Sequence, residues 1–206
     1  MKYATCVTLG YLLGMISPSA FFSRLKNVNL REEGSGNLGA SNTFLVLGKG
    51  YGFFVMLFDV SKSLAASKLA RFLFPGLSMA GPLAGLAAIV GHIFPFYMHF
   101  KGGKGLAAFG GMILAFDWKV FILLAVVAIS LIVITSRSVI APVSVSVLFP
   151  AVVWLRTGAG GVFAVALTAS LLILAVHRDN MKMALVRADM PVRAYIKSKF
   201  CSETRQ

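Results

Sequence analysis

The sequence predicts an all-α, polytopic membrane protein with about seven transmembrane helices joined by glycine-rich cytoplasmic loops. Of its 206 residues, 58% are hydrophobic and only 13% are charged, which is more apolar surface than a soluble domain of this length can bury. Apolar runs long enough for membrane helices recur along the chain. Most of the Lys and Arg residues, which give a formal net charge of +13, lie between those runs.

The predicted spans follow from these apolar runs. The first starts just after Lys2 and has no small-x-small cleavage site before Arg24, so we expect a retained helix and not a removed signal peptide. Residues 105–135 are equally consistent with two spans, one long kinked helix, or a re-entrant piece followed by a span. The spans are expected near 4–23, 51–70, 79–98, 105–117, 119–135, 139–155 and 161–176.

The distribution of basic residues predicts the orientation, because cytoplasmic loops carry the excess of Lys and Arg. With the N-terminus outside, the basic residues of 24–50, of 100–105 and of the segment after His177 all fall on the cytoplasmic side. The chain is then one membrane domain, 1–206, that ends in a basic cytoplasmic tail, 178–206, of which residues 190–206 are expected to lie against the lipid headgroups. Only Lys2, Arg71, Lys119 and Arg156 fall outside.

Other classes of partner are not expected. The basic residues alternate with apolar runs and form no stripe on a soluble module, so we expect no nucleic acid. Cys6 and Cys201 fall on opposite sides of the membrane, which excludes a disulfide between them, and neither neighbours a metal-like cluster. We therefore expect neither a metal nor another cofactor.

Three polar segments carry the candidate chemistry. The loop at 100–105 (FKGGKG) combines Lys101 and Lys104 with three glycines, a composition that is typical of phosphate binding. The segment 31–42 (REEGSGNLGASN) is also rich in glycine, and residues 40–47 are expected to begin a helix whose N-terminus favours an anion. An ordinary capped turn is the alternative for this segment.

The third segment follows the last predicted span. His177 and Asn180 are three residues apart and would share one face of a helical turn, and His can exchange a proton near neutral pH. Within the second span, Asp59 and Lys62 have the same spacing and are expected to form a structural ion pair, with substrate contact as the alternative. His92, close to Pro95, is expected to be a hydrogen-bond donor that orients its helix, with a catalytic role as the alternative.

These segments together resemble a known family. The runs 34–42 (GSGNLGASN), 91–95 (GHIFP) leading into 100–105 (FKGGKG), and 177–180 (HRDN) are similar in order and spacing to the three signature motifs of the bacterial acyl-phosphate:glycerol-3-phosphate acyltransferases. The resemblance covers nearly the whole chain. It implies a seven-span inner-membrane enzyme of phospholipid biosynthesis whose active site faces the cytoplasm.

The resemblance also implies a reaction and a set of site residues. The reaction is acyl transfer from a fatty acyl phosphate to the 1-hydroxyl of glycerol 3-phosphate, giving 1-acylglycerol 3-phosphate and inorganic phosphate. The implied catalytic residues are Ser35, Lys104, His177 and Asn180. The implied substrate-binding residues are Gly34, Gly36, Asn37, Gly39, Asn42, Lys101, Gly102, Gly103 and Asp189.

Two sequence features bear on the choice of substrate. The fifth residue after each His is Tyr97, Lys104 or Lys182, so the His-x4-Asp dyad of thioester-using acyltransferases is absent, which favours an acyl phosphate donor. The family usually has Arg where this chain has Leu45, and that arginine is a natural phosphate clamp. Smaller departures are Ser63, Met183 and Asp189.

Several interpretations stay open at this point. The departures allow an active enzyme, a paralogue with a changed acceptor or donor, or an inactive relative. A small anion transporter is the alternative from a different class, although the chain has no convincing internal repeat. The proton of the acceptor hydroxyl passes either to His177 or to the departing phosphate.

Overall fold

The computed structural model describes residues 1–158 and 160–186, and every regular element within them is helical. The predicted all-α fold is confirmed, and helical residues occur in all seven predicted spans, although two of the spans contain a break. The elements are α1 (Lys2–Met15), α2 (Pro18–Leu25), α3 (Ala40–Leu47), α4 (Lys49–Leu73), α5 (Ala80–Ile93), the 3-10 turn η1 (Phe96–Met98), α6 (Leu106–Phe116), α7 (Trp118–Thr135), α8 (Ile140–Thr157) and α9 (Gly161–Val186).

Within the described residues, five helical segments are long and apolar enough to cross a membrane: Lys2–Leu25, Ala80–Met98, Trp118–Thr135, Ile140–Thr157 and Gly161–Ala184. The other two predicted spans correspond to α4 and α6. α4 has 25 residues, but its middle carries Asp59 and Lys62. α6 has 11 residues and is therefore about 16 Å long, which is shorter than a bilayer core of about 30 Å.

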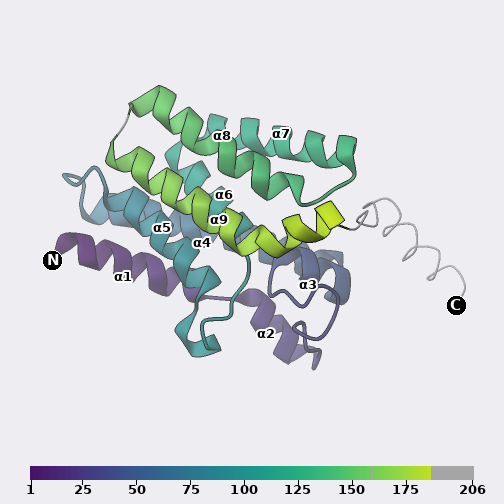
Figure 1. Cartoon of the computed structure of the whole chain (residues 1–206). Coiled ribbons are helices and arrows are strands. Elements are labelled where there is room, and N and C mark those ends of the chain that lie inside the picture. Colours follow the sequence, from purple (N-terminus) through teal and green to yellow (C-terminus); the bar gives the residue numbers. More distant parts are fainter. Residues whose placement is uncertain (159, 187–206) are drawn as a thin grey trace, which may run out of the picture.

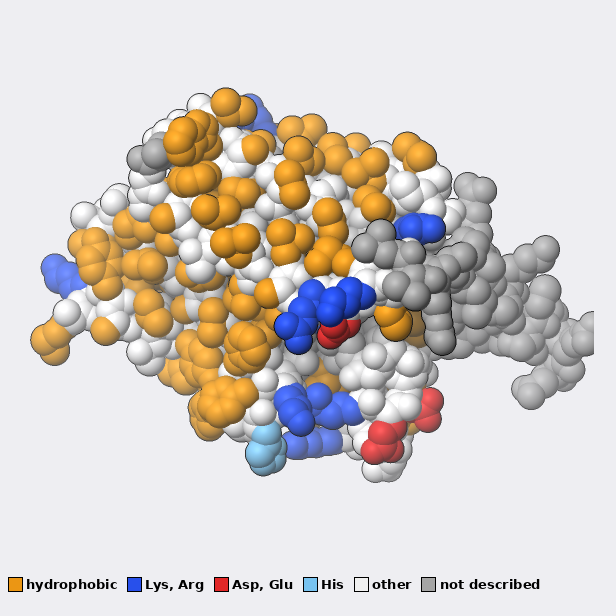
Figure 2. Space-filling model, viewed as in Figure 1, with side chains coloured by type: hydrophobic (Ala, Val, Ile, Leu, Met, Phe, Trp, Pro, Cys, Tyr) orange, Lys and Arg blue, Asp and Glu red, His pale blue; other side chains and the backbone are white. Residues whose placement is uncertain are grey.

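The long helices form one bundle (Figure 1), in which α1 packs on α5, α4 packs on both α5 and α6, and α9 packs on α8. α7 contacts α8 at one flank of the bundle, and the short helices α2 and α3 lie at the end that carries the segment 31–42, the first loop in chain order. Much of the visible surface is hydrophobic, while charged side chains gather around that same end (Figure 2). The polar segments predicted from the sequence therefore lie at one end of an apolar bundle.

The first predicted span, 4–23, is wrong as a single helix, because the chain breaks between α1 and α2. Pro18 has no backbone N–H and disfavours helical geometry in the residue before it, and Ser17 caps α2 by accepting from the N–H of Ala20 at 3.4 Å. The break leaves two carbonyls without helical partners. Tyr97 donates its hydroxyl to the carbonyl of Met15 at 2.7 Å, and Lys62 donates to that of Ile16 at 2.8 Å.

Small residues bring α1 and α5 together. A Cβ added at Gly14 would lie 2.1 Å from the carbonyl oxygen of Ala88, and one added at Gly10 would lie 2.2 Å from that of Ala84. Such contact of helix backbones is typical of membrane proteins, in which helices associate by close packing. The rest of this core is also small, with Ala66 on α4 fully buried beside them.

A second core of large side chains lies between α6, α7, α8 and α9. Phe149 of α8 meets the rings of Phe109 and Phe116 edge to face, with ring centroids 5.5 and 5.7 Å away. Ile113 and Ile173 are buried in the same cluster. This bulky core holds α9, which carries the third motif, against the rest of the bundle.

Two more predicted boundaries are corrected by the structure. The alternative of one long kinked helix over 105–135 is wrong, because Asp117 ends α6 and its carboxylate caps α7 by accepting from the N–H groups of Lys119 and Val120. The predicted end of the last span at 176 is ten residues too early, since α9 continues to Val186. His177 and Asn180 are therefore helical residues.

Candidate functional site

The first loop is shaped by Asn42, which is completely buried on α3. Its side-chain oxygen accepts from the N–H of Ser35 at 2.7 Å, and its side-chain nitrogen donates to the carbonyls of Leu30 at 2.9 Å and Glu33 at 3.1 Å. Gly34, with φ of 61°, passes so close that an added Cβ would lie 2.3 Å from the Asn42 oxygen. Asn42 is thus occupied with the loop, and it leaves the Ser35 side chain exposed.

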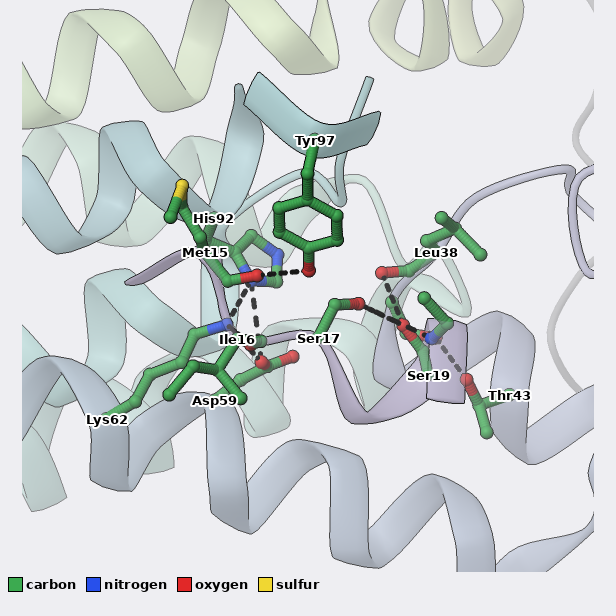
Figure 3. Close-up of polar contacts among 12 residues, drawn as sticks. Met15, Ile16, Ser17, Ser19, Leu38, Thr43, Asp59, Lys62, His92 and Tyr97 are labelled. Carbon is green, nitrogen blue, oxygen red and sulfur yellow. Dashed lines mark hydrogen bonds and ion pairs between the residues drawn. The ribbon is translucent and has the colours of Figure 1, made fainter. Parts of the chain in front are cut away.

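The predicted helix at 40–47 is confirmed as α3, which begins directly after Gly39. Its first turn is held by Thr43, whose hydroxyl donates to the Gly39 carbonyl at 3.0 Å. The preceding carbonyl, of Leu38, accepts from the buried hydroxyl of Ser19 at 3.1 Å (Figure 3). Contacts from α2 and α3 therefore fix the end of the first loop, including the segment that carries Gly36 and Asn37.

The second loop, residues 100–105, folds back onto the end of α5. The N–H of Gly102 donates to the carbonyl of Ile93 at 2.8 Å, and the N–H of Gly103 donates to that of His92 at 3.2 Å. A Cβ at Gly102 would lie 2.0 Å from the His92 oxygen, so only glycine fits there. These N–H groups already have acceptors, and the two glycines serve close packing, which the sequence reasoning did not foresee.

The first and second loops lie against each other. The guanidinium of Arg31 donates to the carbonyl of Lys101, which bridges the two loops. A Cβ at Gly103 would lie 2.4 Å from Nε2 of His92 and 2.7 Å from the carbonyl oxygen of Leu38. The first two motifs are therefore in contact at Gly103.

Lys104 joins the second loop to the third motif. Its ammonium donates to the side-chain oxygen of Asn180 on α9. Partial burial lowers the pKa of Lys104 from its ordinary value, and the negative charge of Asp179 partly opposes that shift. A partly desolvated cation interacts more strongly with a phosphate than a fully solvated one does.

His177 lies on the same face of α9 as Asn180, one turn earlier. Its Nδ1 is 2.9 Å from the carbonyl oxygen of Ile173, and the residue is only 7% exposed. Because a carbonyl only accepts hydrogen bonds, Nδ1 must be the protonated ring nitrogen, and Nε2 of the neutral imidazole then carries a lone pair. The fold thus leaves a nitrogen able to accept a proton.

Asp59, Lys62 and His92 form a buried cluster behind the second loop (Figure 3). The ammonium of Lys62 is 2.7 Å from Oδ1 of Asp59 and 2.8 Å from Nδ1 of His92, and both ion-pair side chains are 3% exposed. The predicted ion pair is present. The prediction that His92 donates a hydrogen bond that orients its helix is not confirmed, because its contact is with the ammonium of Lys62. An ammonium has no lone pair, so Nδ1 accepts and the ring proton of His92 lies on Nε2, beside Gly103.

A polar cleft of about 660 Å³ lies beside the first loop. Its walls include Arg24, Arg31 and His99, together with Asn29 and Leu38. The positive charge of Arg24 and Arg31 suits this cleft to an anion.

Within the described part of the chain, no group of three or more His, Cys, Asp or Glu side chains is placed to hold a metal ion.

The structure brings most of the implied site residues into one region. Lys101, Gly102, Gly103 and Lys104 contact the first loop on one side and Asn180 on the other. The hydroxyl of Ser35 makes no hydrogen bond to another described side chain, and Asp189 lies outside the described residues. Arg31 and Ser19 were missed as positioning residues, because their partners are backbone carbonyls far away in sequence.

Comparisons with known proteins agree with this arrangement. The family model described as glycerol-3-phosphate acyltransferase matches residues 4–186. A glycerol-3-phosphate acyltransferase of Enterococcus faecalis is 37% identical over 199 residues, covering 88% of each chain, and one of Macrococcus caseolyticus is 43% identical over 143 residues, covering 68% of this chain and 71% of that one.

Two solved structures are also similar. The crystal structure of PlsY, an integral membrane glycerol 3-phosphate acyltransferase, in its glycerol 3-phosphate form superposes with a TM-score of 0.84 at 30% identity, covering 90% of this chain and 92% of that one. Its lysophosphatidic acid form gives a TM-score of 0.82 at 29% identity, with the same coverage. The resemblance read from the three motifs is confirmed, and the chain belongs to the glycerol-3-phosphate acyltransferase family.

Proposed function

We propose that the protein transfers a fatty acyl group from an acyl phosphate to the 1-hydroxyl of glycerol 3-phosphate. The products are 1-acylglycerol 3-phosphate, a lysophosphatidic acid, and inorganic phosphate. The observation that carries this proposal is the contact of Lys104 with Asn180, which joins the second and third motifs at the polar end of an apolar bundle. The crystal structures of the related PlsY in a glycerol 3-phosphate form and in a lysophosphatidic acid form support the proposed acceptor and product.

The proposed step needs no covalent intermediate on the enzyme. The acceptor hydroxyl oxygen forms a bond to the acyl carbonyl carbon, and the bond from that carbon to the phosphate oxygen breaks. Phosphate leaves with the electron pair, because an acyl phosphate is a mixed anhydride with a good leaving group. The hydroxyl proton passes to Nε2 of His177, the ring nitrogen that the Ile173 contact leaves with a lone pair.

Each side chain has a proposed role. The ammonium of Lys104 pairs with the phosphate of the donor and stabilises the charge that grows on it as it leaves. Asn180 holds Lys104 in place and directs its amide N–H groups toward the developing oxyanion. The exposed hydroxyl of Ser35, whose backbone Asn42 fixes, positions the glycerol phosphate.

The glycines act mainly through the shape of the two loops. Gly34, Gly36, Gly102 and Gly103 allow close approaches that a side chain would block. Direct contact of substrate with Asn37, Gly39 and Lys101 stays a prediction. Asn42 is proposed to act through Ser35, since its own amide is engaged by the loop.

The substitution at Leu45 bears on acceptor binding. One lost charge-assisted hydrogen bond weakens phosphate binding by about ten- to a hundredfold. Arg24 and Arg31 line the cleft beside the first loop and are proposed to supply positive charge to the acceptor phosphate in this chain. The expected outcome is a raised KM for glycerol 3-phosphate with turnover retained.

An assay with purified protein tests the reaction. The full chain in detergent is incubated with a fatty acyl phosphate and glycerol 3-phosphate, and phosphate release and the monoacyl product are both measured. Lys104→Met should abolish product, whereas Lys119→Met, which removes an exposed cation at the far end of the bundle, should not. No product above the Lys104→Met level would overturn the proposal.

Changes of substrate test the remaining alternatives. Acyl-CoA in place of acyl phosphate should give no product. Product with another polyol phosphate but not with glycerol 3-phosphate would identify a paralogue with a changed acceptor.

We further infer that the site faces the cytoplasm of a bacterium and that the N-terminus lies outside the inner membrane, as the distribution of basic residues predicts. In a chain that carries serine at Cys6 and Cys201, a membrane-impermeant maleimide should label Lys119→Cys in intact cells. Lys26→Cys should be labelled only after lysis, and the reverse pattern would overturn the orientation.

A further inference from the structure

A second cavity, of about 170 Å³, lies at the end of the bundle away from Lys104. It is lined by the last turns of α4 and α6, the first turns of α5 and α9, and part of α8. From Gly105 to Phe116, which lines the cavity, the chain advances about 16 Å along the axis of α6. The cavity is therefore separate from the proposed active site.

The walls of this cavity combine an apolar surface with one unpartnered hydroxyl. Met112, Phe149 and Ala166 supply apolar walls. Ser67 lines the cavity as well, is only 5% exposed, and its hydroxyl has no hydrogen-bond partner among the described residues. Ser63, Ser146 and Ser170 are also buried without a hydrogen-bond partner among the described residues, but of these serines Ser67 lines the cavity, where a ligand that offers an oxygen would satisfy its hydroxyl.

Two cations also line the cavity. Lys68 and Arg71 follow Ser67 on α4, and neither forms an ion pair with any acidic residue that the structure describes. Asp117, which follows the lining residue Phe116, is engaged by Arg156. Lys and Arg near the end of a membrane helix extend toward the headgroup region, where phosphates are found.

We propose that this cavity binds a phosphate-bearing lipid from the membrane leaflet opposite the active site. The lipid phosphate pairs with Lys68 and Arg71, because guanidinium and ammonium groups form charge-assisted hydrogen bonds with phosphate oxygens. The hydroxyl of Ser67 donates to an ester oxygen, and the start of an acyl chain packs on Met112 and Phe149. The ligand class is an anionic phospholipid.

Binding can be measured by native mass spectrometry of the full chain released from a neutral detergent. The probes are short-chain phosphatidylglycerol, phosphatidylcholine with the same chains, and inorganic phosphate. The variant Lys68→Gln/Arg71→Gln removes both charges, and Ser67→Ala removes the hydroxyl. Lys119→Gln is the matched control, because Lys119 is an exposed cation at the same end of the bundle that does not line the cavity.

We expect one tightly held phosphatidylglycerol on the unmodified chain and weaker binding of phosphatidylcholine. Binding of phosphatidylglycerol should fall about tenfold or more in the double variant and about fivefold in Ser67→Ala, and should be unchanged in Lys119→Gln. Acyl transfer in neutral detergent should stay normal in all three, which shows that they fold.

Two results would overturn the proposal. Equal binding of phosphatidylglycerol to the double variant and the unmodified chain would mean that the lipid sits elsewhere. Inorganic phosphate that binds as tightly as the lipid and displaces it would mean that the site takes a free anion and not a lipid.

Discussion

Lys104 connects the charge of the second loop to the helix that carries the third motif. Its pKa is lowered because the ammonium is partly buried, with Asp179 opposing the shift, and its hydrogen bond to Asn180 sets its position. The side chain is therefore a cation whose charge is lost at a lower pH than that of an ordinary lysine.

This lowered pKa predicts the pH dependence of activity. Phosphate binding needs the ammonium, so kcat/KM for acyl phosphate should fall as pH rises through the lowered pKa of Lys104 in the free enzyme. Lys104→Arg keeps the charge to higher pH and should move that decline upward. The decline is measured from initial rates corrected for spontaneous hydrolysis of the acyl phosphate. If kcat/KM declined at the same alkaline pH in the unmodified chain and in Lys104→Arg, the titrating group would not be Lys104.

His177 gives a second prediction for a single residue. If Nε2 accepts the hydroxyl proton, His177→Ala should lower kcat about a hundredfold or more while the KM for acyl phosphate changes little. Ser35→Ala is the comparison, because Ser35 is proposed to bind the acceptor. If His177→Ala keeps a near-normal kcat while Lys104→Ala and Ser35→Ala are inactive, the departing phosphate, and not His177, accepts the hydroxyl proton.

At the scale of elements, the contact of α1 with α5 depends on the absence of side chains. Gly10 and Gly14 lie directly against carbonyl oxygens of α5, so any Cβ there must push the two helices apart. α5 ends at Ile93 and carries the carbonyls that hold Gly102 and Gly103. A shift of α5 would therefore also displace the second loop.

Gly14→Ala should destabilise the protein by about 1 to 3 kcal/mol, since it overpacks an interface that is already in contact. Gly50→Ala is the matched control, because nothing lies within 4 Å of a Cβ added on that helical residue. Thermal unfolding in detergent compares the two variants. An equal midpoint for both would show that α1 and α5 can separate without cost.

At the scale of the whole molecule, one buried cluster ties together three parts of the bundle. Lys62 of α4 contacts Asp59 on its own helix, the carbonyl of Ile16 at the break between α1 and α2, and His92 of α5. His92 in turn lies beside Gly103. The cluster therefore supports the second loop from inside the bundle.

Removing one charge of the Asp59–Lys62 pair should lower the free energy of unfolding more than removing both charges. Lys62→Met leaves the carboxylate of Asp59 buried without its cation and should destabilise the protein by about 3 to 5 kcal/mol. Asp59→Asn combined with Lys62→Met should recover part of that loss. Unfolding free energies of the single and double variants form the test, and additive losses would mean that the pair is not coupled.

Sequence reasoning located the helices and the three motifs because the lengths of apolar runs and the positions of proline and glycine determine local structure. It placed the helix at 40–47 correctly, but its span at 79–98 runs past the end of α5 at Ile93. It missed the break at Ser17, although Pro18 signalled it, because the apolar run continues across the break and hydropathy outweighed one residue. It ended α9 too early for the opposite reason, since polar residues can continue a helix beyond the membrane core.

The sequence by itself determined the membrane class, the helical fold and the family, since composition and ordered motifs are properties of the chain alone. Only the tertiary structure decided which groups hydrogen-bond to the protein's own backbone and which side chains from distant motifs meet. Asn42 and the N–H groups of Gly102 and Gly103 are occupied by the protein's own backbone, whereas Lys104 meets Asn180 from 76 residues away. Hydrogen-bond partners of this kind depend on how distant segments pack, and no local pattern in the sequence encodes that packing.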